Sequence, residues 1–490
     1  MSETMVLPRN ADYRDVLPLE AHSQSKRRNY FPVNGQTFTS TGNNIIRIDI
    51  SGDAFLNPKT SYLSFRFTNN TGQALGVDFG GGHTFIRRLR VEQSGNIITD
   101  CNQYHRLLSS CLLPTQGNVD SVKHRSISEN VRFANDKGAG ALQTNSLING
   151  DLTGASVSTP ITGSSQVLNN AAGAPPTPGS QATFCIPLMN GLLGPNQSKM
   201  IPLQLLGSSP ITIEIELANL LDIGCWAVAP AAGVDYQLDQ VKYSAQLVEV
   251  PPQITEQVRM VQEVSNGRLI LSGTDWTHFN ANVPQNATGM QSLNVPARRR
   301  SIKSIWWVGA SQTYGAGVNA QDALYNLSFS GNMNMTDYSI KIGAVQYPPT
   351  PIRCNYGGVQ NPINRRAEHL YEIEKALGVA SSIGGVGVIS SSNFATNDCD
   401  VANMPGRVNA GTGALDSTFE FSPFALDLES FQRVSADGGA VNTADRATPI
   451  TLQLNIDPPA AGADAFNVDA YVCYSSLFYI NADGSIRVSY

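Results

Sequence analysis

Hydrophobic and polar residues alternate with a period of two in short runs along most of the chain. In Asn44–Ile50, three isoleucines alternate with Arg47 and Asp49, and Ser61–Phe67 repeats the pattern with Leu, Phe and Phe on one side. Such alternation predicts half-buried β-strands. The other strands predicted in the first half are Phe85–Val91, Phe184–Leu188, Lys199–Leu205, Ile211–Leu217 and Val241–Val250.

The second half of the chain contains the same kind of short hydrophobic runs. Strands do not alternate with helices in either half, which argues against a doubly wound α/β fold or an α/β barrel. The pattern therefore predicts an all-β protein built from two antiparallel sandwiches. The strands predicted in the second half are Arg268–Ser272, Trp276–Phe279, Ser292–Pro296, Arg300–Val308, Leu324–Phe329, Tyr338–Gly343, Phe419–Phe421, Phe424–Leu426, Ile450–Ile456 and Asp469–Tyr479.

Two segments have helical periodicity instead. Arg365–Leu377 carries hydrophobic residues at three- and four-residue spacing and stops at Gly378, a residue that favours helix ends. Tyr104–Cys111 places its hydrophobic residues on one helical face, and Asp100 is the expected N-terminal cap. We therefore expect a small helix in each half.

Stretches rich in Gly, Ser, Asn and Pro divide the chain into units. We interpret 1–30 as an N-terminal arm, 31–252 as the first β unit and 260–490 as the second. Each unit contains a long polar segment, 134–181 in the first and 379–415 in the second, and we expect both to be surface loops.

Similar patterns recur in the two units. Phe85–Val91 resembles Ile302–Val308, and Ile211–Leu217 resembles Ile450–Ile456, although few residues are identical. This recurrence predicts that one module was duplicated.

Composition narrows the class of protein. Of the 490 residues, 15% are charged and the net charge is −6, which excludes a strongly basic protein that coats nucleic acid. The surface must then be polar but weakly charged, as expected of a protein that packs against copies of itself. The chain contains no run of eighteen apolar residues that would predict a membrane helix, and the N-terminus lacks a signal peptide, so we expect synthesis in the cytoplasm.

The seven cysteines are scattered and form no CxxC pair, which predicts buried, reduced thiols. Cys225, followed by Trp226, is interpreted as a small buried hydrophobic residue. The six histidines show no metal-ligand spacing, and we expect them to be structural. They are His22, His83, His105, His124, His278 and His369.

Little in the sequence predicts catalysis. Gly191–Gly194 followed by Lys199 resembles a phosphate-binding loop but fails its spacing, and 384–387 is expected to be a flexible glycine-rich loop. We expect no enzyme activity, cofactor, metal or catalytic residue. One alternative stays open: a carbohydrate-binding or carbohydrate-active β-sandwich, since paired carboxylates leave no spacing signature. Such a protein needs exposed aromatic residues. Alternation turns one of Trp306 and Trp307 inward and leaves at most one for that use, while Trp276 is undecided.

Two basic clusters stand out on this acidic chain: 26–28, which is Lys-Arg-Arg, and 298–300, which is Arg-Arg-Arg with Lys303 nearby. They could face nucleic acid or an anionic membrane. The preferred interpretation is that they solvate strand ends or pair with carboxylates of a neighbouring copy.

Several stretches resemble the double jelly-roll major capsid proteins of tailless icosahedral double-stranded DNA viruses. Phe85–Asp100 with the helix at Tyr104–Cys111 is similar to the early strands and helix of their first roll, and Met200–Leu217 to its late strands. Phe424–Phe431 is similar to a segment of large nucleocytoplasmic DNA viruses, although 432–439 departs from their Pro- and Ser-Gly-rich turn. Tyr338–Pro351 followed by the second helix resembles virophages and polinton-like viruses.

The resemblance implies two tandem eight-stranded jelly rolls with long loops and a few short helices. It implies a structural protein of the virion whose homotrimers form pseudo-hexagonal capsomers that tile an icosahedral shell. The implied partners are neighbouring capsomers, minor capsid and penton proteins, and an internal membrane or the genome at the capsomer base. The two long loops would form outward towers and the N-terminal arm would lie at the base.

Overall fold

A computed structural model describes the chain at residues 23–71, 75–77, 80–113, 128–129, 181–207, 209–226, 231–311, 327, 330–331, 333, 335–354, 367–377, 419–420, 423–429, 440–444, 449–457 and 465–489. These residues do not include most of the predicted N-terminal arm, nearly all of both predicted long loops, or the predicted strand Leu324–Phe329 except for Leu327.

Eight strands of the first half form two facing antiparallel sheets. One sheet has the order β1-β12-β4-β8, with the short strands β2 and β9 at its side, and the other has the order β3-β10-β6-β7. A small pair, β11-β5, stands apart. The bounds are β1 (Gln24–Tyr30), β2 (Thr37–Phe38), β3 (Ile45–Ile50), β4 (Phe55–Asn69), β5 (Leu75–Val77), β6 (Ile86–Gln93), β7 (Asn96–Asn102), β8 (Gln181–Ile186), β9 (Ile201–Pro202), β10 (Ile211–Leu217), β11 (Gly224–Trp226) and β12 (Tyr236–Glu249).

The second half forms two further sheets. One has the order β13-β22-β15, with β16, β19, β20 and β23 paired to its members, and the other has the order β14-β21-β17-β18. The bounds are β13 (Arg268–Val283), β14 (Gly289–Val295), β15 (Ile302–Ser311), β16 (Ser330–Gly331), β17 (Met335–Ile342), β18 (Val345–Arg353), β19 (Phe419–Glu420), β20 (Phe424–Asp427), β21 (Ile450–Ile456), β22 (Phe466–Asn481) and β23 (Ile486–Ser489).

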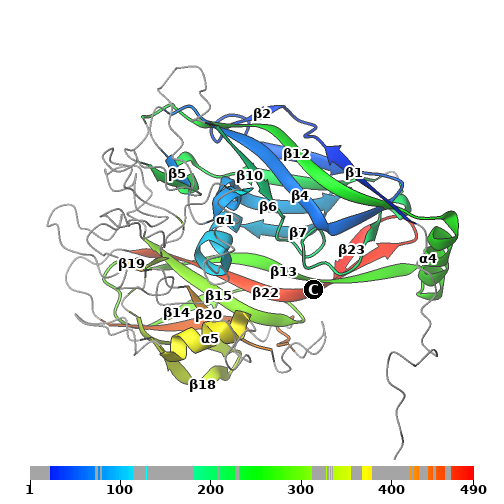
Figure 1. The fold of residues 1–490 in the computed structure, drawn as a ribbon. Helices are drawn as coiled ribbons and strands as arrows, with labels where there is room; N and C mark the ends of the chain where they lie inside the picture. The colour runs from blue at the N-terminus through cyan, green and yellow to red at the C-terminus, as the bar shows by residue number, and fades with distance from the viewer. Residues whose placement is uncertain are drawn as a thin grey trace, which may run out of the picture.

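The two halves share one strand order. Ranked along the chain, the eight main strands of the first half give 1-8-3-6 in one sheet and 2-7-4-5 in the other. The second half gives the same two orders, with β13-β22-β15-β20 and β14-β21-β17-β18. This is the arrangement of an eight-stranded jelly roll. The predicted all-β fold of two tandem jelly rolls is confirmed, and Figure 1 shows the first roll above the second.

One of the two predicted correspondences between the halves is wrong. Ile211–Leu217 and Ile450–Ile456 are both seventh in their rolls, as predicted. Phe85–Val91, however, lies mainly in the fourth strand of the first roll, β6, whereas Ile302–Val308 lies in the third strand of the second, β15. Both strands have the same alternating pattern, and this pattern does not indicate which position a strand takes in the order of its roll.

Several strand boundaries also differ from the prediction. The predicted strands Arg268–Ser272 and Trp276–Phe279 are parts of one long strand, β13, which pairs with β22 without interruption. Gln24–Tyr30, in the predicted arm, pairs with β12 along its whole length as β1. Strand β18 contains three prolines and lies at a sheet edge, where the missing N–H donors are tolerated.

Helices occupy equivalent places in the two rolls. The predicted helix of the second roll is α5 (Ala367–Leu377). In the first roll, α1 (Tyr104–Arg106) continues into a π-helical segment, η3 (Leu107–Leu112), and each helix follows the fifth strand of its roll. The predicted cap was wrong: Asp100 lies within β7 and binds Arg88, and Gln103 precedes the helix instead.

A third helix, not predicted, connects the rolls. It is α4 (Pro252–Val264), which lies at the end of the molecule opposite β5 and β19 (Figure 1). Short 3₁₀ turns complete the described elements at Gly81–Phe85 (η2), Leu203–Leu205 (η5) and Leu220–Ile223 (η6). Among the described residues, no helix is both long and apolar enough to cross a bilayer.

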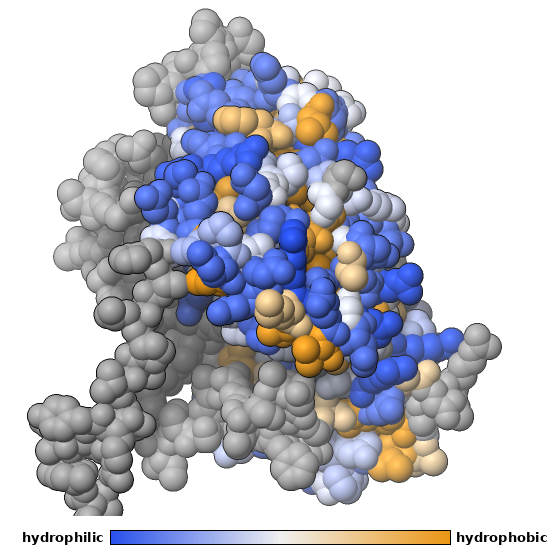
Figure 2. Space-filling model, turned by 90° about the vertical axis from the view of Figure 1, so that its right-hand side faces the viewer, coloured by the Kyte–Doolittle hydropathy of each residue, from blue (hydrophilic) through white to orange (hydrophobic). Residues whose placement is uncertain are grey.

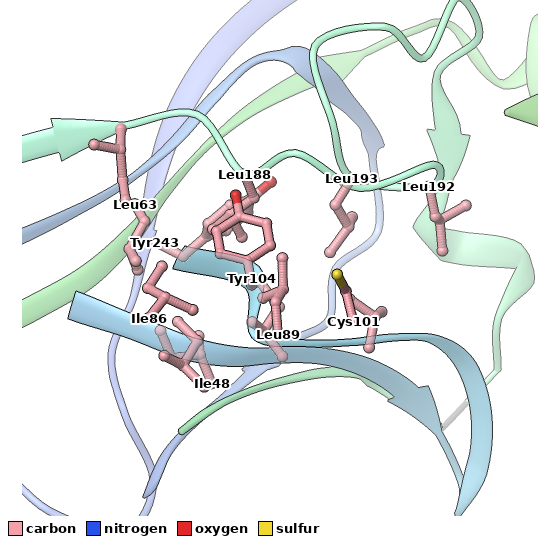
Figure 3. Close-up of a cluster of buried hydrophobic side chains, with 14 of the residues drawn as sticks. Ile48, Leu63, Ile86, Leu89, Cys101, Tyr104, Leu188, Leu192, Leu193 and Tyr243 are labelled. Atoms are coloured by element: carbon pink, nitrogen blue, oxygen red, sulfur yellow. The ribbon is translucent and has the colours of Figure 1, made fainter. Parts of the chain in front are cut away.

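The side chains predicted to face inward are buried. Ile46, Ile48 and Ile50 of β3, and the alternate hydrophobic residues of β4, lie in the core of the first roll. Figure 3 shows Tyr104 in this core, with Leu188 and Leu89 beside it. The helix that follows β7 is therefore part of the core packing.

Trp306 and Trp307 are both buried, which agrees with the prediction that at most one of them is exposed. Trp306 belongs to the first hydrophobic core and Trp307 to the second. The reason is that β15 lies in a sheet that is covered on both faces, by its own roll and by the first roll. Neither indole is available to a sugar, which removes the aromatic residues that the carbohydrate alternative needed most.

Candidate functional site at the junction of the two jelly rolls

The ribbon formed by β13 and β22 connects the two cores. In its register, residues whose numbers add up to 749 lie opposite each other, so Phe279 and Ala470 share a face with Leu271 and Phe478. Phe279 and Ala470 pack in the core of the second roll, whereas Leu271 and Phe478 pack in the core of the first roll. One face of the ribbon thus passes from one core to the other, as a strongly twisted two-stranded ribbon allows.

A buried ionic cluster fixes the first helix of the first roll to this ribbon. Arg106 Nη1 donates to Asp469 Oδ2 over 2.9 Å. The other carboxylate oxygen lies 2.7 Å from His278 Nε2 and accepts from Asn280 Nδ2 over 3.0 Å. Nearby, the Tyr471 hydroxyl donates to the Gln103 carbonyl over 3.0 Å. The carboxylate is therefore hydrogen-bonded from both rolls.

Electrostatics keep Asp469 ionised. Burial alone would raise the pKa of this carboxyl, but the charge of Arg106 and the hydrogen bonds from His278 and Asn280 outweigh burial and lower the pKa to about 2. A buried charge of this kind is tolerated only with its partners in place. The cluster therefore depends on the correct docking of the two rolls.

A second contact brings the backbones of the two rolls together. A methyl group added to Gly273 of β13 would lie 2.4 Å from the carbonyl oxygen of Gly191, in the first roll. Gly191 begins the segment that resembled a phosphate loop. Its glycines serve packing, since a Cβ at Gly194 would lie 2.2 Å from the Asn190 carbonyl oxygen, and Lys199 Nζ donates to the Ile270 carbonyl.

Asp275 is buried beside this contact. Burial raises the pKa of its carboxyl to about 7, and hydrogen bonds from the Trp276 and Gly191 backbones reduce the effect only in part. Unlike Asp469, it forms no ion pair with another described residue. The junction thus holds one carboxylate stabilised by charge and one destabilised by burial.

The C-terminal hairpin closes the junction near its other end. The Gln93 side chain, buried at the end of β6, donates to the Gly484 carbonyl over 3.0 Å and accepts from the Ile486 amide over 2.6 Å. The side-chain amide of Gln93 thus pairs with the backbone of residues 484 and 486, as the backbone of a neighbouring strand would. The two rolls are therefore joined by apolar, ionic and backbone contacts along the ribbon.

The predicted basic clusters have different surroundings. Lys26 pairs with Glu249 over 2.7 Å, and the guanidinium groups of Arg27 and Arg28 lie over Tyr62 and Tyr30, at 5.2 and 5.0 Å from the ring centres. Contacts within the chain thus engage this cluster. In the second cluster, Arg299 lies 4.6 Å from the ring centre of Tyr474, and Lys303 donates to Thr274 Oγ1.

The histidines and cysteines within the described residues have structural surroundings. His83 is 3.2 Å from the Tyr104 hydroxyl, and His369 is 3.0 Å from the Pro423 carbonyl and stacked on Phe424. No group of metal-ligating side chains gathers within the described parts of the chain. The free cysteines 101, 111, 354 and 473 are buried as predicted, whereas Cys185 is exposed at the outer strand β8. His22, His124, Cys399, 384–387 and the Cys225 side chain lie outside the described residues.

The outer faces of the two equivalent four-stranded sheets differ in charge. The face of β3-β10-β6-β7 carries paired charges, with Arg47 3.0 Å from Glu214 and Arg90 2.8 Å from Glu92. The matching face of β21, the central strand of the second roll's sheet, carries Thr451, Gln453 and Asn455. The two rolls therefore share a strand order but present different surfaces.

The sequence missed the junction cluster because its members are far apart: residue 106, residues 278–280 and residue 469. The sequence did contain one signal: Asp469 stands beside a run of hydrophobic residues in β22. In the structure this carboxylate is buried. A charged residue in such a strand indicates a buried partner, but the alternation pattern does not identify it.

No protein-family profile matches the sequence, and no curated protein is detectably similar to it. Solved structures with the same fold do exist. VP54 of the virus PBCV-1, fitted into a reconstruction of the virophage Sputnik, is 13% identical, with 98% of this chain and 99% of that chain covered and a TM-score of 0.55. The Faustovirus major capsid protein is 9% identical, with 97% and 92% covered and a TM-score of 0.53.

A chain in the structure of the Sputnik virophage is 11% identical, with 100% of this chain and 93% of that chain covered and a TM-score of 0.53. The similarity spans both rolls in each case. At these identities it establishes a shared fold.

Proposed function

We propose that this chain is the major capsid protein of an icosahedral double-stranded DNA virus, with a structural role in the virion. The observation that carries the proposal is the repeated strand order, 1-8-3-6 and 2-7-4-5 in each half, on a chain whose fold matches the Faustovirus major capsid protein over nearly its full length. A chain with two equivalent rolls lets three copies present six similar walls, and so fill a hexagonal position in a shell.

In the proposed capsomer, the predicted units 31–252 and 260–490 are the two rolls and stand side by side, with β1 (Gln24–Tyr30) added to the first roll. Strands β8 and β19 follow the long segments of the two rolls and begin at the end opposite α4. Gln181 pairs with Thr68, and Phe419 pairs with Gly331, which pairs in turn with Gly309 near the end of β15. This common position supports outward towers at that end. The base would then be the end that carries α4 and the start of β1.

The weakly charged surface supports assembly. With 15% charged residues, little charge has to lose its hydration where copies meet. The outer face of the second roll carries fewer charges, with Asp337, Lys341 and Arg353 beside the neutral residues of β21, and is the better wall between copies of one trimer. The more densely charged face of the first roll suits contacts that depend on ionic strength. The proposed partners are neighbouring capsomers, minor capsid and penton proteins, and an internal membrane or the genome at the base.

Light scattering coupled to size-exclusion chromatography tests the trimer. The purified chain should elute as a species of three times the chain mass at micromolar concentration, and negative-stain images should show pseudo-hexagonal particles. A monomer at that concentration would contradict the proposed capsomer. Hydrolysis of polysaccharides by the purified chain would instead favour the carbohydrate-active alternative.

A further inference from the structure

A cleft of about 490 Å³ lies beside the junction, where β15 stops short of the end of β22. The last residue of β22 that pairs with β15 is Tyr474, and β23 pairs with β22 only from Leu477 onward. Between these two partners, the Ser475 amide donates to the Ser301 carbonyl over 2.9 Å, and the cleft lies beside this hydrogen bond. Figure 2 shows the α4 end of the molecule, where hydrophilic residues cover most of the described surface.

The floor of the cleft is the polar half of the β13–β22 ribbon. Ser272, Thr274 and Ser475 lie on the ribbon face opposite Leu271 and Phe478, which pack in the first core. Ser272, Thr274 and Ser475 belong to neither hydrophobic core of the described residues. Asn196 and Ser198 of the first roll form one side of the cleft, so both rolls contribute to it.

The lining combines hydrogen-bonding groups and positive charge with the apolar residues Gly273 and Leu477. Its charged members are Arg300 and Lys303, its other polar members are hydroxyl and amide side chains, and none of its residues is an aspartate or glutamate. A site for a cation would be expected to contain carboxylates, so their absence from this lining argues against a cation as the ligand. Hydroxyl, guanidinium and ammonium groups together are the donors that bind oxyanions.

The two cations are placed differently. Lys303 Nζ donates to Thr274 Oγ1 over 3.1 Å, and its nearest carboxylate oxygen, on Glu429, is 3.8 Å away. The hydroxyl of Thr274 then keeps its own proton for a ligand. The exposed guanidinium of Arg300 has no hydrogen bond or ion pair with any described residue. Arg300 is therefore the group with unused capacity for a bidentate contact.

We propose that this cleft binds a small phosphate-class oxyanion, either inorganic phosphate or a phosphomonoester. Arg300 and Lys303 supply the charge, and the hydroxyls of Ser272 and Thr274 supply hydrogen bonds to the remaining oxygens. Because Asn196 and Ser198 come from the first roll and the other residues from the second, a bound phosphate stabilises the docking of the two rolls. The inference rests on the cleft alone and does not require the capsid role.

Phosphorus-31 NMR of inorganic phosphate tests binding directly. The phosphate signal should broaden on addition of wild-type protein, and Arg300→Gln should abolish the broadening. Arg298→Gln is the matched control, because it removes the same charge from the same loop at a residue outside the cleft. Equal broadening by the wild type and Arg300→Gln, or no broadening by the wild type, would overturn the proposal.

Thermal unfolding provides a second readout. Phosphate at ten times its dissociation constant should lower the unfolding constant of the wild type about elevenfold, whereas sodium chloride of equal ionic strength should not. Lys303→Arg should keep this response and Lys303→Gln should lose most of it, which protects the test if Arg300→Gln folds poorly. The same measurement with glycerol phosphate distinguishes the two ligands. Tighter binding of glycerol phosphate would identify a phosphomonoester site, and tighter binding of inorganic phosphate would identify a site for the free ion. A rise in stability that never saturates and is the same in every variant would be a general salt effect and would contradict the site.

Discussion

Trp306 and Trp307 are consecutive residues of one strand, yet their indole rings lie in different hydrophobic cores. Trp307 stacks on Phe424 inside the second roll, with the ring centres 5.7 Å apart. Trp306 points to the opposite side of the sheet and packs with residues of the first roll. The two rolls thus share this sheet and form one continuous folded body.

The tryptophan pair therefore predicts two large losses of stability from neighbouring positions. Trp306→Ala and Trp307→Ala should each lower the free energy of unfolding by about 3–5 kcal/mol, since each leaves a cavity in a packed core. Urea denaturation followed by circular dichroism measures the loss. Tyr371→Ala, at an exposed position of α5, is the control and should change it by about 0.5 kcal/mol or less. A small effect of Trp306→Ala would mean that the rolls do not share a core.

Asp469 predicts sensitivity to acid. Its pKa is about 2 in the folded chain and about 3.9 in an unfolded one, so its stabilising effect is complete above about pH 4 and is lost as the pH falls towards 2. Asp469→Asn should lack this component of the pH dependence. At neutral pH the variant should lose about 3–5 kcal/mol, because Arg106 stays buried without its partner.

The control for this variant is Asp239→Asn, which breaks the more exposed pair with Arg66 and should cost about 1 kcal/mol or less. Urea midpoints at several pH values provide the comparison. Equal losses in the two variants would show that the Arg106–Asp469 pair does not hold the junction.

Asp275 predicts the opposite pH dependence. Its pKa is raised to about 7, so between about pH 4 and 7 the unfolded chain is ionised while the folded chain still holds the proton. Asp275 therefore lowers the free energy of unfolding progressively as the pH rises from about 4 to 7, and this loss stays constant above pH 7. Asp275→Asn should be more stable than the wild type at pH 8 by up to about 4 kcal/mol, with little difference at pH 4. A stability difference that does not change with pH would contradict the raised pKa.

The glycine contact predicts a steric effect at the junction. Gly273→Ala should lower stability by about 1–3 kcal/mol, because the added methyl group meets the Gly191 carbonyl and forces the rolls apart. Gly52→Ala is the matched control, since its nearest neighbour, a Leu203 methyl carbon, would be 3.4 Å away. Limited proteolysis between the rolls, near α4, should accelerate in Gly273→Ala only. Equal cleavage rates would place the strain elsewhere.

The alternation of residues such as Ile211–Leu217 predicted the strands and the all-β class because each roll has a buried and a solvated side. It did not predict that Trp306 and Trp307 would both be buried, since the cover over the second face comes from the other roll. The rank of each strand and the Arg106–Asp469 pair were also beyond the sequence, because both depend on contacts between residues hundreds of positions apart. The helix α4 was not predicted, although it begins at Pro252 and proline is well accommodated in a first helical turn.

Single-particle cryo-electron microscopy of the purified full-length chain tests the proposed capsomer most directly. We expect class averages with threefold symmetry and six similar lobes around the rim, two from each chain. Particles with two lobes only, or assemblies with another symmetry, would contradict the proposed major capsid role.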